Sequence, residues 1–342
     1  MKRRPPSPFL MMPRMVNRAI IAYVILRVLF GSRWWWLGFL NTFAFWLFLP
    51  LIAVALLAAW LGGKRSASVS LLLFVLGMLQ FAPLPIGLFT ASDAPHDIRV
   101  LTYNVLGHNG RIIETVDWMI AQDADILILQ ELIDDNLDSQ LPRLLALYPH
   151  HTYVDGNVRI LSRLPMLDGE TIWLQDPSPT RDGRLAVRAV VDLDGQALTI
   201  YGVHLNVPRG TKHHGNIVTG IDTLDFILRY DESNRNAQIY NLVERIRNEQ
   251  HPVILAGDFN TSHTSPILGN LSAIGMVDAF RAVGTGWGMT WSHQPPALPL
   301  IRIDYVWASS DFIARRFHLG GFMGADGSDH LPLVVDYSLN SQ

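Results

Sequence analysis

The stretch Val253-Ile254-Leu255-Ala256-Gly257-Asp258-Phe259-Asn260 joins an uninterrupted apolar run to two polar side chains. A short aliphatic run bounded by proline and glycine, here Pro252 and Gly257, is typical of a strand that is buried on both faces. Asp258 and Asn260 are two positions apart, so on extended chain their side chains leave on the same side. Glycine, aspartate and asparagine also form turns, which leaves a plain turn open beside a catalytic strand end.

Other predicted strands carry polar residues in the same way. In chain order these residues are Asn104 after Ile98–Tyr103, Gln130-Glu131 after Asp125–Leu129, His204 after Ala197–Val203, Asp304 within Ile303–Trp307, and Ser328-Asp329-His330 before Leu333–Val335. Each has a plain alternative: a structural histidine, a cross-strand aspartate pair or a loop. All the alternatives must hold together to explain the ordered set, so the set favours a functional site.

This ordered set, with the tetrad at 257–260, resembles the endonuclease/exonuclease/phosphatase superfamily, also called the deoxyribonuclease-I-like fold. The resemblance covers residues 97–338. Each motif is short, but six of them in the right order are specific. The resemblance implies an α/β fold, a four-layer α/β sandwich in which two mixed sheets face each other and the site lies at one end.

Two carboxylates are the expected metal ligands. Glu131 and Asp329 offer the hard oxygen donors that Mg²⁺ prefers, with Mn²⁺ as the alternative ion. An ion held by one or two carboxylates keeps positions free for water and a substrate phosphate. The resemblance places Asn104 beside the metal, where it would help to orient the ion or the scissile phosphate.

The remaining site residues are expected to carry the proton and the phosphate. Asp258 is placed to accept a proton from the attacking water or to orient it, and Asn260 to donate a hydrogen bond to a non-bridging oxygen. The resemblance implies that His330 binds phosphate and that Asp304 orients its ring and favours the imidazolium form. His204 is expected to contact the phosphate from the opposite side, or to protonate the leaving oxygen.

Segments outside these motifs are assigned to packing and to the surface. Val207–Asn234 is longer than a tight connection requires and is predicted to shape substrate access. Asn236–Glu249 has apolar residues at helical spacing and is predicted to cover the sheet. Eight further histidines in predicted loops are interpreted as surface residues: His108, His150, His151, His213, His214, His251, His263 and His293.

The N-terminal third predicts an integral membrane protein, anchored by two or three transmembrane helices. Trp34–Leu61 is 28 residues without a charge and Val69–Phe89 is another 21, and about 20 apolar residues suffice to cross a bilayer. Two buried core helices, the alternative, would require a partner domain that the sequence lacks. Val16–Phe30 is apolar but contains Arg18 and Arg27, so it is either a third span or an interfacial helix.

The number of spans sets the side of the membrane on which the catalytic domain lies. With three spans, the N-terminal positive charges and the Lys64-Arg65 turn are all cytoplasmic, in keeping with the positive-inside tendency, and the catalytic domain is outside. With two spans the catalytic domain is inside. Membrane-anchored members that the chain resembles favour the extracytoplasmic side, which is our expectation. The predicted parts are a membrane region (1–89), a linker (90–96) and a catalytic domain (97–342).

Charge divides sharply along the chain. Residues 1–96 hold nine Lys or Arg against one acid, a net charge of +8, and residues 97–342 hold 18 against 29, a net charge of −11. Nonspecific nucleic-acid binding depends on neutralising phosphates with Lys and Arg, so a lipid headgroup or a small phosphoester is favoured over nucleic acid as substrate. The absence of cysteine excludes a disulfide, a thiolate nucleophile and a cysteine-ligated zinc site.

The sequence therefore predicts a membrane-anchored, Mg²⁺-dependent hydrolase of phosphoester bonds, in which water attacks phosphorus in line. The family resemblance favours a phosphodiester over a monoester. Two alternatives stay open: a membrane-bound nuclease with the same chemistry, and a catalytically silent receptor for a phosphorylated ligand. The expected partners are the phosphoester substrate and the lipid bilayer, without an obligatory protein partner.

Overall fold

A computed structural model describes residues 8–83, 87–107, 109–131, 139–152, 158–174, 185–208, 226–292, 298–320 and 327–340. The chain forms two compact units. The first comprises Met1–Ala82 with Gly215–Asp231 and Ser262–Pro266, and the second comprises Pro83–His214, Glu232–Thr261 and Ile267–Gln342.

Within the described residues, the second unit contains two sheets of six strands each. The first sheet has the order β11 (Phe312–Leu319), β12 (Leu333–Leu339), β1 (Ile98–Asn104), β2 (Ile126–Gln130), β4 (Val158–Ser162), β3 (His150–His151). The second has the order β5 (Met166–Trp173), β6 (Leu185–Leu193), β7 (Gln196–His204), β8 (Val253–Asp258), β10 (Asp304–Ala308), β9 (Val277–Asp278).

Each sheet contains one parallel pair of neighbouring strands, β1 with β2 and β7 with β8, and the other pairs are antiparallel. Parallel neighbours need a long crossover connection. The crossovers contain α7 (Ile112–Ala121) and α11 (Ser233–Arg247). The carboxyl ends of both strands of each pair therefore lie at the same edge of their sheet.

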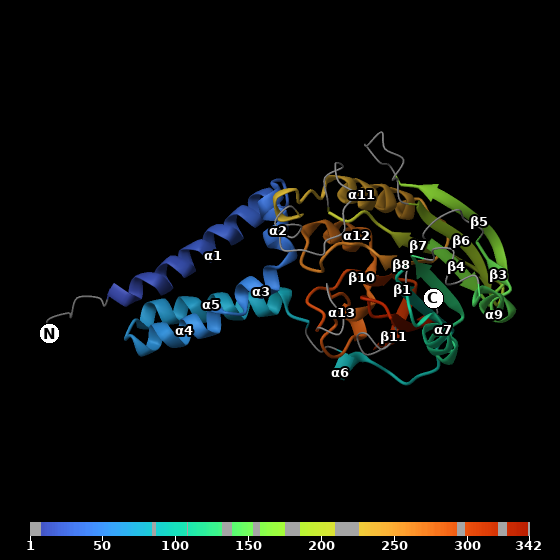
Figure 1. Ribbon diagram of the computed structural model, residues 1–342, viewed down its shortest axis with the longest axis horizontal. Coiled ribbons are helices and arrows are strands. Elements are labelled where there is room, and N and C mark those ends of the chain that lie inside the picture. Colours follow the sequence, from blue (N-terminus) through green and yellow to red (C-terminus); the bar gives the residue numbers. More distant parts are fainter. Residues whose placement is uncertain are drawn as a thin grey trace. The chain divides into compact units, whose positions relative to one another are not determined.

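The two sheets face each other and are covered by helices on their outer sides (Figure 1). Val100 and Ile128 of the first sheet and Ile200 and Ile254 of the second belong to one buried apolar cluster between the sheets. A second cluster joins α11 and α12 (Gly269–Ala273) to the second sheet. A third joins α7 and α9 (Leu141–Leu147) to the first sheet. This confirms the two facing mixed sheets predicted from the sequence.

The segment that precedes β1 lies along the second unit. Helix α6 (Gly87–Thr90) packs against α13 (Ala279–Val283), with the Gly87 amide donating to the Gly284 carbonyl at 2.9 Å. Further on, the Ser92 amide donates to the Arg315 carbonyl at 2.8 Å. Residues 90–96, predicted as a linker, are therefore hydrogen-bonded to the domain that they lead into.

Helices make up the described N-terminal part of the first unit. They are the 3-10 helix η1 (Pro8–Leu10) and the α-helices α1 (Met11–Phe30), α2 (Trp35–Thr42), α3 (Ala44–Phe48), α4 (Leu51–Trp60) and α5 (Lys64–Phe81). Polar contacts link them: the buried Ser70 hydroxyl donates to Asn17 Oδ1 at 2.7 Å, and the part-buried Arg27 guanidinium donates to Asn41 Oδ1 at 2.7 Å.

The uncharged run Trp34–Leu61, predicted as one span, is divided among α2, α3 and α4. Two carbonyls at the end of α2 accept hydrogen bonds from hydroxyls of the segment Ser262–Pro266: Thr264 donates to the Asn41 carbonyl at 2.5 Å and Ser262 to the Thr42 carbonyl at 2.9 Å. These contacts lie at the point where α2 ends, and Pro50, which has no N–H to donate, lies between α3 and α4.

Among the described residues, α5 is long and apolar enough to cross a membrane by itself. Helices α1 and α2 pass the same test as a pair, but the pair is bent by 112° at the break between them. Ala44–Trp60 is apolar but shorter. Helix α5 begins at Lys64 and ends before Pro83, so it is shifted towards the N-terminus relative to the predicted span Val69–Phe89.

The structure confirms the predicted packing helix at 236–249, which is α11, with Ile239, Leu242, Val243 and Ile246 buried. The helix begins at Ser233, so the end of the predicted loop Val207–Asn234 is helical, and residues 209–225 of that loop lie outside the described residues. Of the histidines assigned to surface loops, His150 and His151 instead form β3, while His108, His213, His214 and His293 lie outside the described residues.

Two histidines of that set lie in described connections. His251 lies two residues before β8, and His263 is part-buried with its Nε2 3.1 Å from the Phe81 carbonyl of the same unit. His263 is therefore a packed residue and not a free surface side chain. The 3-10 helix η2 (Pro266–Leu268) follows it.

Candidate active site

Strand pairing brings the predicted polar residues to one edge of the two sheets. In the first sheet Asn104 at the end of β1 pairs with Gln130 at the end of β2. In the second sheet His204 at the end of β7 pairs with Asp258 at the end of β8, and Asp304 of β10 pairs with Asp258 from the other side. Three ionisable side chains therefore stand next to one another across three neighbouring strands.

The backbone conformation of the tetrad 257–260 explains why its first residue is glycine. Gly257 has a φ of 140°, and a Cβ at this position would lie 2.0 Å from the Val203 carbonyl oxygen. Only glycine permits β8 to approach β7 this closely. Asn260 and Glu131 adopt left-handed φ values of 47° and 57°, a conformation that costs a non-glycine residue roughly 1 kcal/mol or more and that occurs often at functional sites.

The Asp258 carboxylate is the centre of the cluster and is buried. Its Oδ1 accepts a hydrogen bond from the Asn260 amide at 2.8 Å. Its Oδ2 lies 3.2 Å from Asn104 Nδ2, 3.3 Å from Asn260 Nδ2 and 3.4 Å from His204 Nε2. Donors from three different strand ends therefore converge on one carboxylate.

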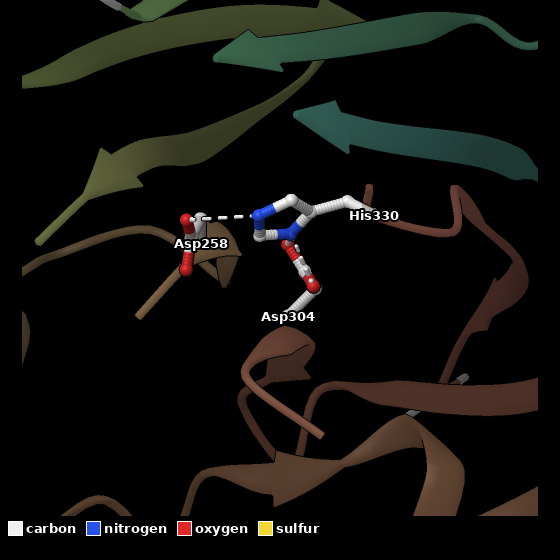
Figure 2. A group of neighbouring side chains, drawn as sticks. All are labelled: Asp258, Asp304 and His330. Atoms are coloured by element: carbon white, nitrogen blue, oxygen red, sulfur yellow. Dashed lines mark hydrogen bonds and ion pairs between the residues drawn. The ribbon is translucent and has the colours of Figure 1, made fainter. Parts of the chain in front are cut away.

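His330 lies between two aspartates (Figure 2). Its Nδ1 is 2.9 and 3.1 Å from the two oxygens of Asp304, and its Nε2 is 3.8 Å from Asp258 Oδ2. Donation of the Nδ1 hydrogen to Asp304 fixes the orientation of the ring, so Nε2 faces the cluster. Asp304 is itself held by its amide, which donates to Thr290 Oγ1 at 3.2 Å.

The surroundings shift the pKa values of both central groups. Burial raises the pKa of Asp258 to about 7, and the nearby His330 only partly opposes this shift. Burial acts to lower the pKa of His330, but the negative charges of Asp304 and Asp258 and the hydrogen bond to Asp304 outweigh it and raise the pKa to about 10. At neutral pH the structure therefore favours an imidazolium at His330 beside a carboxyl group that titrates near pH 7.

Two further carboxylates lie at the open side of the cluster. The side chains of Glu131 and Asp329 are 27% and 25% exposed, whereas those of Asp258 and Asp304 are 2% and 4% exposed. Glu131 Oε1 lies 3.1 Å from Asn104 Nδ2 and Asp329 Oδ1 lies 4.0 Å from His330 Nε2.

The donor set fits a hard divalent cation. Within the described residues, the ligand atoms of Asp258, Asp304 and His330 lie within 4.8 Å of one another, but Asp304 already binds the ring of His330 with both oxygens. The accessible carboxylates of Glu131 and Asp329 suit the partly hydrated coordination of Mg²⁺ better. The Nδ2 of Asn104 donates to the Glu131 carboxylate, and its Oδ1 accepts a hydrogen bond from the Leu106 amide at 3.2 Å. Asn104 therefore acts toward the carboxylates as a hydrogen-bond donor.

The structure thus brings together all eight residues singled out from the sequence: Asn104, Glu131, His204, Asp258, Asn260, Asp304, Asp329 and His330. It adds two supports. Trp291 Nε1 donates to Asp329 Oδ2 at 3.0 Å, and the Ser328 hydroxyl donates to the Asn104 carbonyl at 2.7 Å. Ser328 belongs to the motif Ser328-Asp329-His330, so the sequence could have identified it as a site residue. No local sequence pattern identifies Trp291.

Two facing mixed sheets with a buried acid–histidine cluster and accessible carboxylates at one edge define the class: an α/β sandwich with a candidate site at the end of its sheets. The model of the Endonuclease/Exonuclease/phosphatase family matches residues 101–330. The chain belongs to this family, which includes phosphoesterases and nucleases and whose members are mostly hydrolases acting on phosphoester bonds.

Solved structures share the fold. An endonuclease/exonuclease/phosphatase from Beutenbergia cavernae is 20% identical, with 72% of each chain covered and a TM-score of 0.52. The human Nocturnin catalytic domain, with a bound sulfate anion, is 21% identical over 75% of this chain and 99% of its own, with a TM-score of 0.54. TDP2 from D. rerio, complexed with a single-strand DNA product, is 19% identical over 71% and 99%, with a TM-score of 0.53. A search of curated proteins found no match.

Proposed function

We propose that this protein is a membrane-anchored, divalent-metal-dependent phosphodiesterase, with Mg²⁺ as the first candidate ion and Mn²⁺ as the second. The observation that carries the proposal is the position of Asp258. Its Oδ2 lies 3.4 Å from the His204 ring and 3.8 Å from the His330 ring, with amide donors of Asn104 and Asn260 on the same oxygen.

The residues of the chain divide the work of hydrolysis. Asp258, whose pKa burial raises to about 7, is poised to take a proton from the attacking water near neutral pH. His330 presents a positively charged donor to a phosphate oxygen, since Asp304 holds its other nitrogen. His204 donates a hydrogen bond where negative charge develops, and Asn260 donates to Asp258 and holds its carboxylate in place. A divalent ion held by Glu131 and Asp329 would neutralise charge on the phosphate when bound.

The exposed apolar surface of α5 and the charge of residues 97–342 favour a membrane location and a lipid-derived substrate. Helix α5 exposes Leu71, Leu72, Leu76 and Leu79, a cost in water that a lipid environment removes. The net charge of −11 on residues 97–342 also makes a polyanion a poor general substrate. A phosphodiester headgroup at a bilayer surface is therefore our leading substrate class, with the catalytic domain on the extracytoplasmic side.

A nuclease is the second candidate, since the similar D. rerio TDP2 has been solved with a single-strand DNA product. The salt dependence of substrate binding distinguishes a nuclease from a lipid phosphodiesterase. Binding of an oligonucleotide by a nuclease weakens steeply as salt is raised, because counterions are released from each neutralised phosphate. Binding that is weak at all salt concentrations would argue against the nuclease.

The test of the proposal is hydrolysis of bis-p-nitrophenyl phosphate by the 342-residue chain in detergent micelles, with Mg²⁺, with Mn²⁺ and with EDTA. Metal-dependent release of nitrophenol, faster than release from the monoester p-nitrophenyl phosphate, is the expected result. Release only from the monoester would overturn the diesterase assignment. If the folded protein hydrolyses neither compound, nor the phospholipids of vesicles, the result would favour a catalytically silent receptor for a phosphorylated ligand.

A further inference from the structure

The first turn of α11 carries a fully buried arginine whose charge is balanced. The Arg235 side chain is 1% exposed, and its Nη2 lies 2.7 Å from Oε1 of Glu232, which is 4% exposed. The guanidinium also donates to the main-chain carbonyl of Asn260. A buried arginine therefore reaches directly to the residue that donates to Asp258.

One helical turn further along α11, Gln238 makes a similar contact to the loop that follows β7. Its Oε1 accepts a hydrogen bond from the Asn206 amide at 2.9 Å, two residues after His204. The loops that follow β7 and β8 are also tied to each other, because Asn260 Nδ2 donates to the Leu205 carbonyl at 2.9 Å. Helix α11 and the two loops thus form one closed hydrogen-bonded network.

We propose that Arg235, supported by Gln238, is a positioning residue that holds the left-handed turn at Asn260 and thereby the geometry of the Asp258–Asn260 pair. The inference rests on the proposed function, because it assigns a role in that same site. Arg235 touches neither of the two central imidazoles in the contacts described, so its effect passes through Asn260.

Several hydrogen bonds hold the turn at Asn260. Asn260 has a φ of 47°, a left-handed conformation that asparagine tolerates when local hydrogen bonds support it, and its carbonyl, amide and side chain all form such bonds. Asn260 Nδ2 is shared between the Leu205 carbonyl at 2.9 Å and Asp258 Oδ2 at 3.3 Å. Release of the carbonyl lets the peptide rotate, and the shared donor then leaves Asp258. Misplacement of a catalytic group by about 1 Å costs roughly 10²-fold in rate.

A matched control exists at the other end of the same helix. Arg188 Nε lies 2.7 Å from Oε1 of Glu249, which follows α11, and the side chains are 16% and 10% exposed. This pair ties the connection that follows α11 to β6 of the second sheet, and the side-chain contacts of Arg188 are to Glu249, Asp168 and Glu170, none of which is a site residue. Arg235→Met and Arg188→Met therefore each remove an arginine–glutamate ion pair next to one end of α11, and only the first removes a hydrogen bond to Asn260.

The experiment uses the 342-residue chain in detergent and two readouts. The first is amide hydrogen exchange of peptides that contain residues 203–207 and 257–262. The second is kcat and KM for bis-p-nitrophenyl phosphate with Mg²⁺. In Arg235→Met we expect lost protection at 257–262 and a fall in kcat of about 10- to 100-fold with KM within about 3-fold. In Arg188→Met we expect both readouts to match the parent even if Tm falls.

Two more variants cover a failure of Arg235→Met to fold. Arg235→Lys keeps a positive donor beside Glu232 and should recover part of kcat, and Gln238→Met should loosen residues 203–207 with a smaller loss of kcat. Unchanged exchange in the Arg235 variants overturns the inference, as does lost protection with unchanged kcat. A parent that lacks turnover overturns the proposed function instead, and the exchange readout then still decides whether Arg235 holds the turn.

Discussion

His204 and Asp258 are paired residues on two parallel strands, and His204 Nε2 lies 3.4 Å from Asp258 Oδ2. The parallel register, and not proximity in sequence, creates this contact, because the crossover through α11 returns the chain to the same edge of the sheet. Both side chains are buried, so the pair is desolvated and sensitive to the charge of either partner.

Replacement of Asp258 by asparagine should abolish turnover in folded protein. The amide keeps the shape of the side chain but cannot accept a proton from water, a loss of about 10²- to 10⁴-fold in kcat. The measurement is hydrolysis of bis-p-nitrophenyl phosphate with Mg²⁺, with circular dichroism to establish folding. The exposed Asp168→Asn is the control and should hydrolyse at the parental rate. A near-normal rate in Asp258→Asn would contradict the assignment of Asp258 as the general base.

His330→Gln should likewise abolish turnover, and Asp304→Asn should lower kcat by about 10²-fold. Without the carboxylate behind it, the ring of His330 loses its fixed orientation and much of its positive charge. The pH dependence of kcat checks the second variant, since its rate should fall at high pH earlier than that of the parent. Equal high-pH limbs in Asp304→Asn and parent would contradict this role.

The stability of metal-free protein should fall as the pH rises from 6 to 9. The pKa of His330 is raised from its ordinary 6.5 to about 10, so the folded state binds that proton more tightly than the unfolded chain, and the stabilisation present below pH 6.5 is lost towards pH 10. The pKa of Asp258, raised from 3.8 to about 7, acts in the same direction between those two values.

Asp304→Asn tests this pH dependence, because Asp304 contributes to raising both pKa values. Its Tm, measured in EDTA at pH 6, 7.5 and 9, should change less with pH than the Tm of the parent. Parallel Tm profiles for the two proteins would show that other groups control the pH dependence.

Removal of the metal should stop hydrolysis, and added Mg²⁺ should restore it. Glu131→Gln and Asp329→Asn should raise the Mg²⁺ concentration needed for half-maximal rate by about 10-fold or more, because each removes a charged oxygen ligand. Calorimetric titration of Mg²⁺ into the substrate-free protein gives a second readout. Full activity after chelation, or unchanged Mg²⁺ affinity in both variants, would remove these residues from the metal site.

The topology can be tested cleanly because the chain has no cysteine. Single substitutions Glu244→Cys, on the exposed face of α11, and Arg65→Cys, in the first turn of α5, place one thiol in each region. We expect a membrane-impermeant maleimide to label Glu244→Cys in intact cells and Arg65→Cys only after permeabilisation. The opposite pattern would place the catalytic domain in the cytoplasm.

Local pattern was enough to predict half of the strands described, including the central strands of both sheets, and the polar residues at their ends. The apolar run 253–256 became β8, the helical spacing at 236–249 became α11, and the six motifs converged at one edge. Strand alternation and buried apolar runs are short-range properties, so they can be recognised without knowledge of the neighbours.

Other features depended on partners far away in the chain. The sequence Trp34–Leu61 predicts one continuous apolar span, but its helix is interrupted after Thr42. There the hydroxyls of Ser262 and Thr264 donate to the carbonyls of Thr42 and Asn41. Likewise nothing near Arg235 in sequence indicates that its guanidinium reaches the carbonyl of Asn260.

The sequence by itself determined the chemistry: which acids, amides and imidazoles stand at the strand ends, and the absence of cysteine. The tertiary structure decided how that chemistry is tuned. The buried Asp258 carboxyl, the Asp304 contact that orients His330, and the Trp291 contact to Asp329 come from strand register and loop packing. Hydrogen-bond geometry and desolvation depend on the positions of atoms that are distant in the chain, and those positions exist only once the two sheets have packed together.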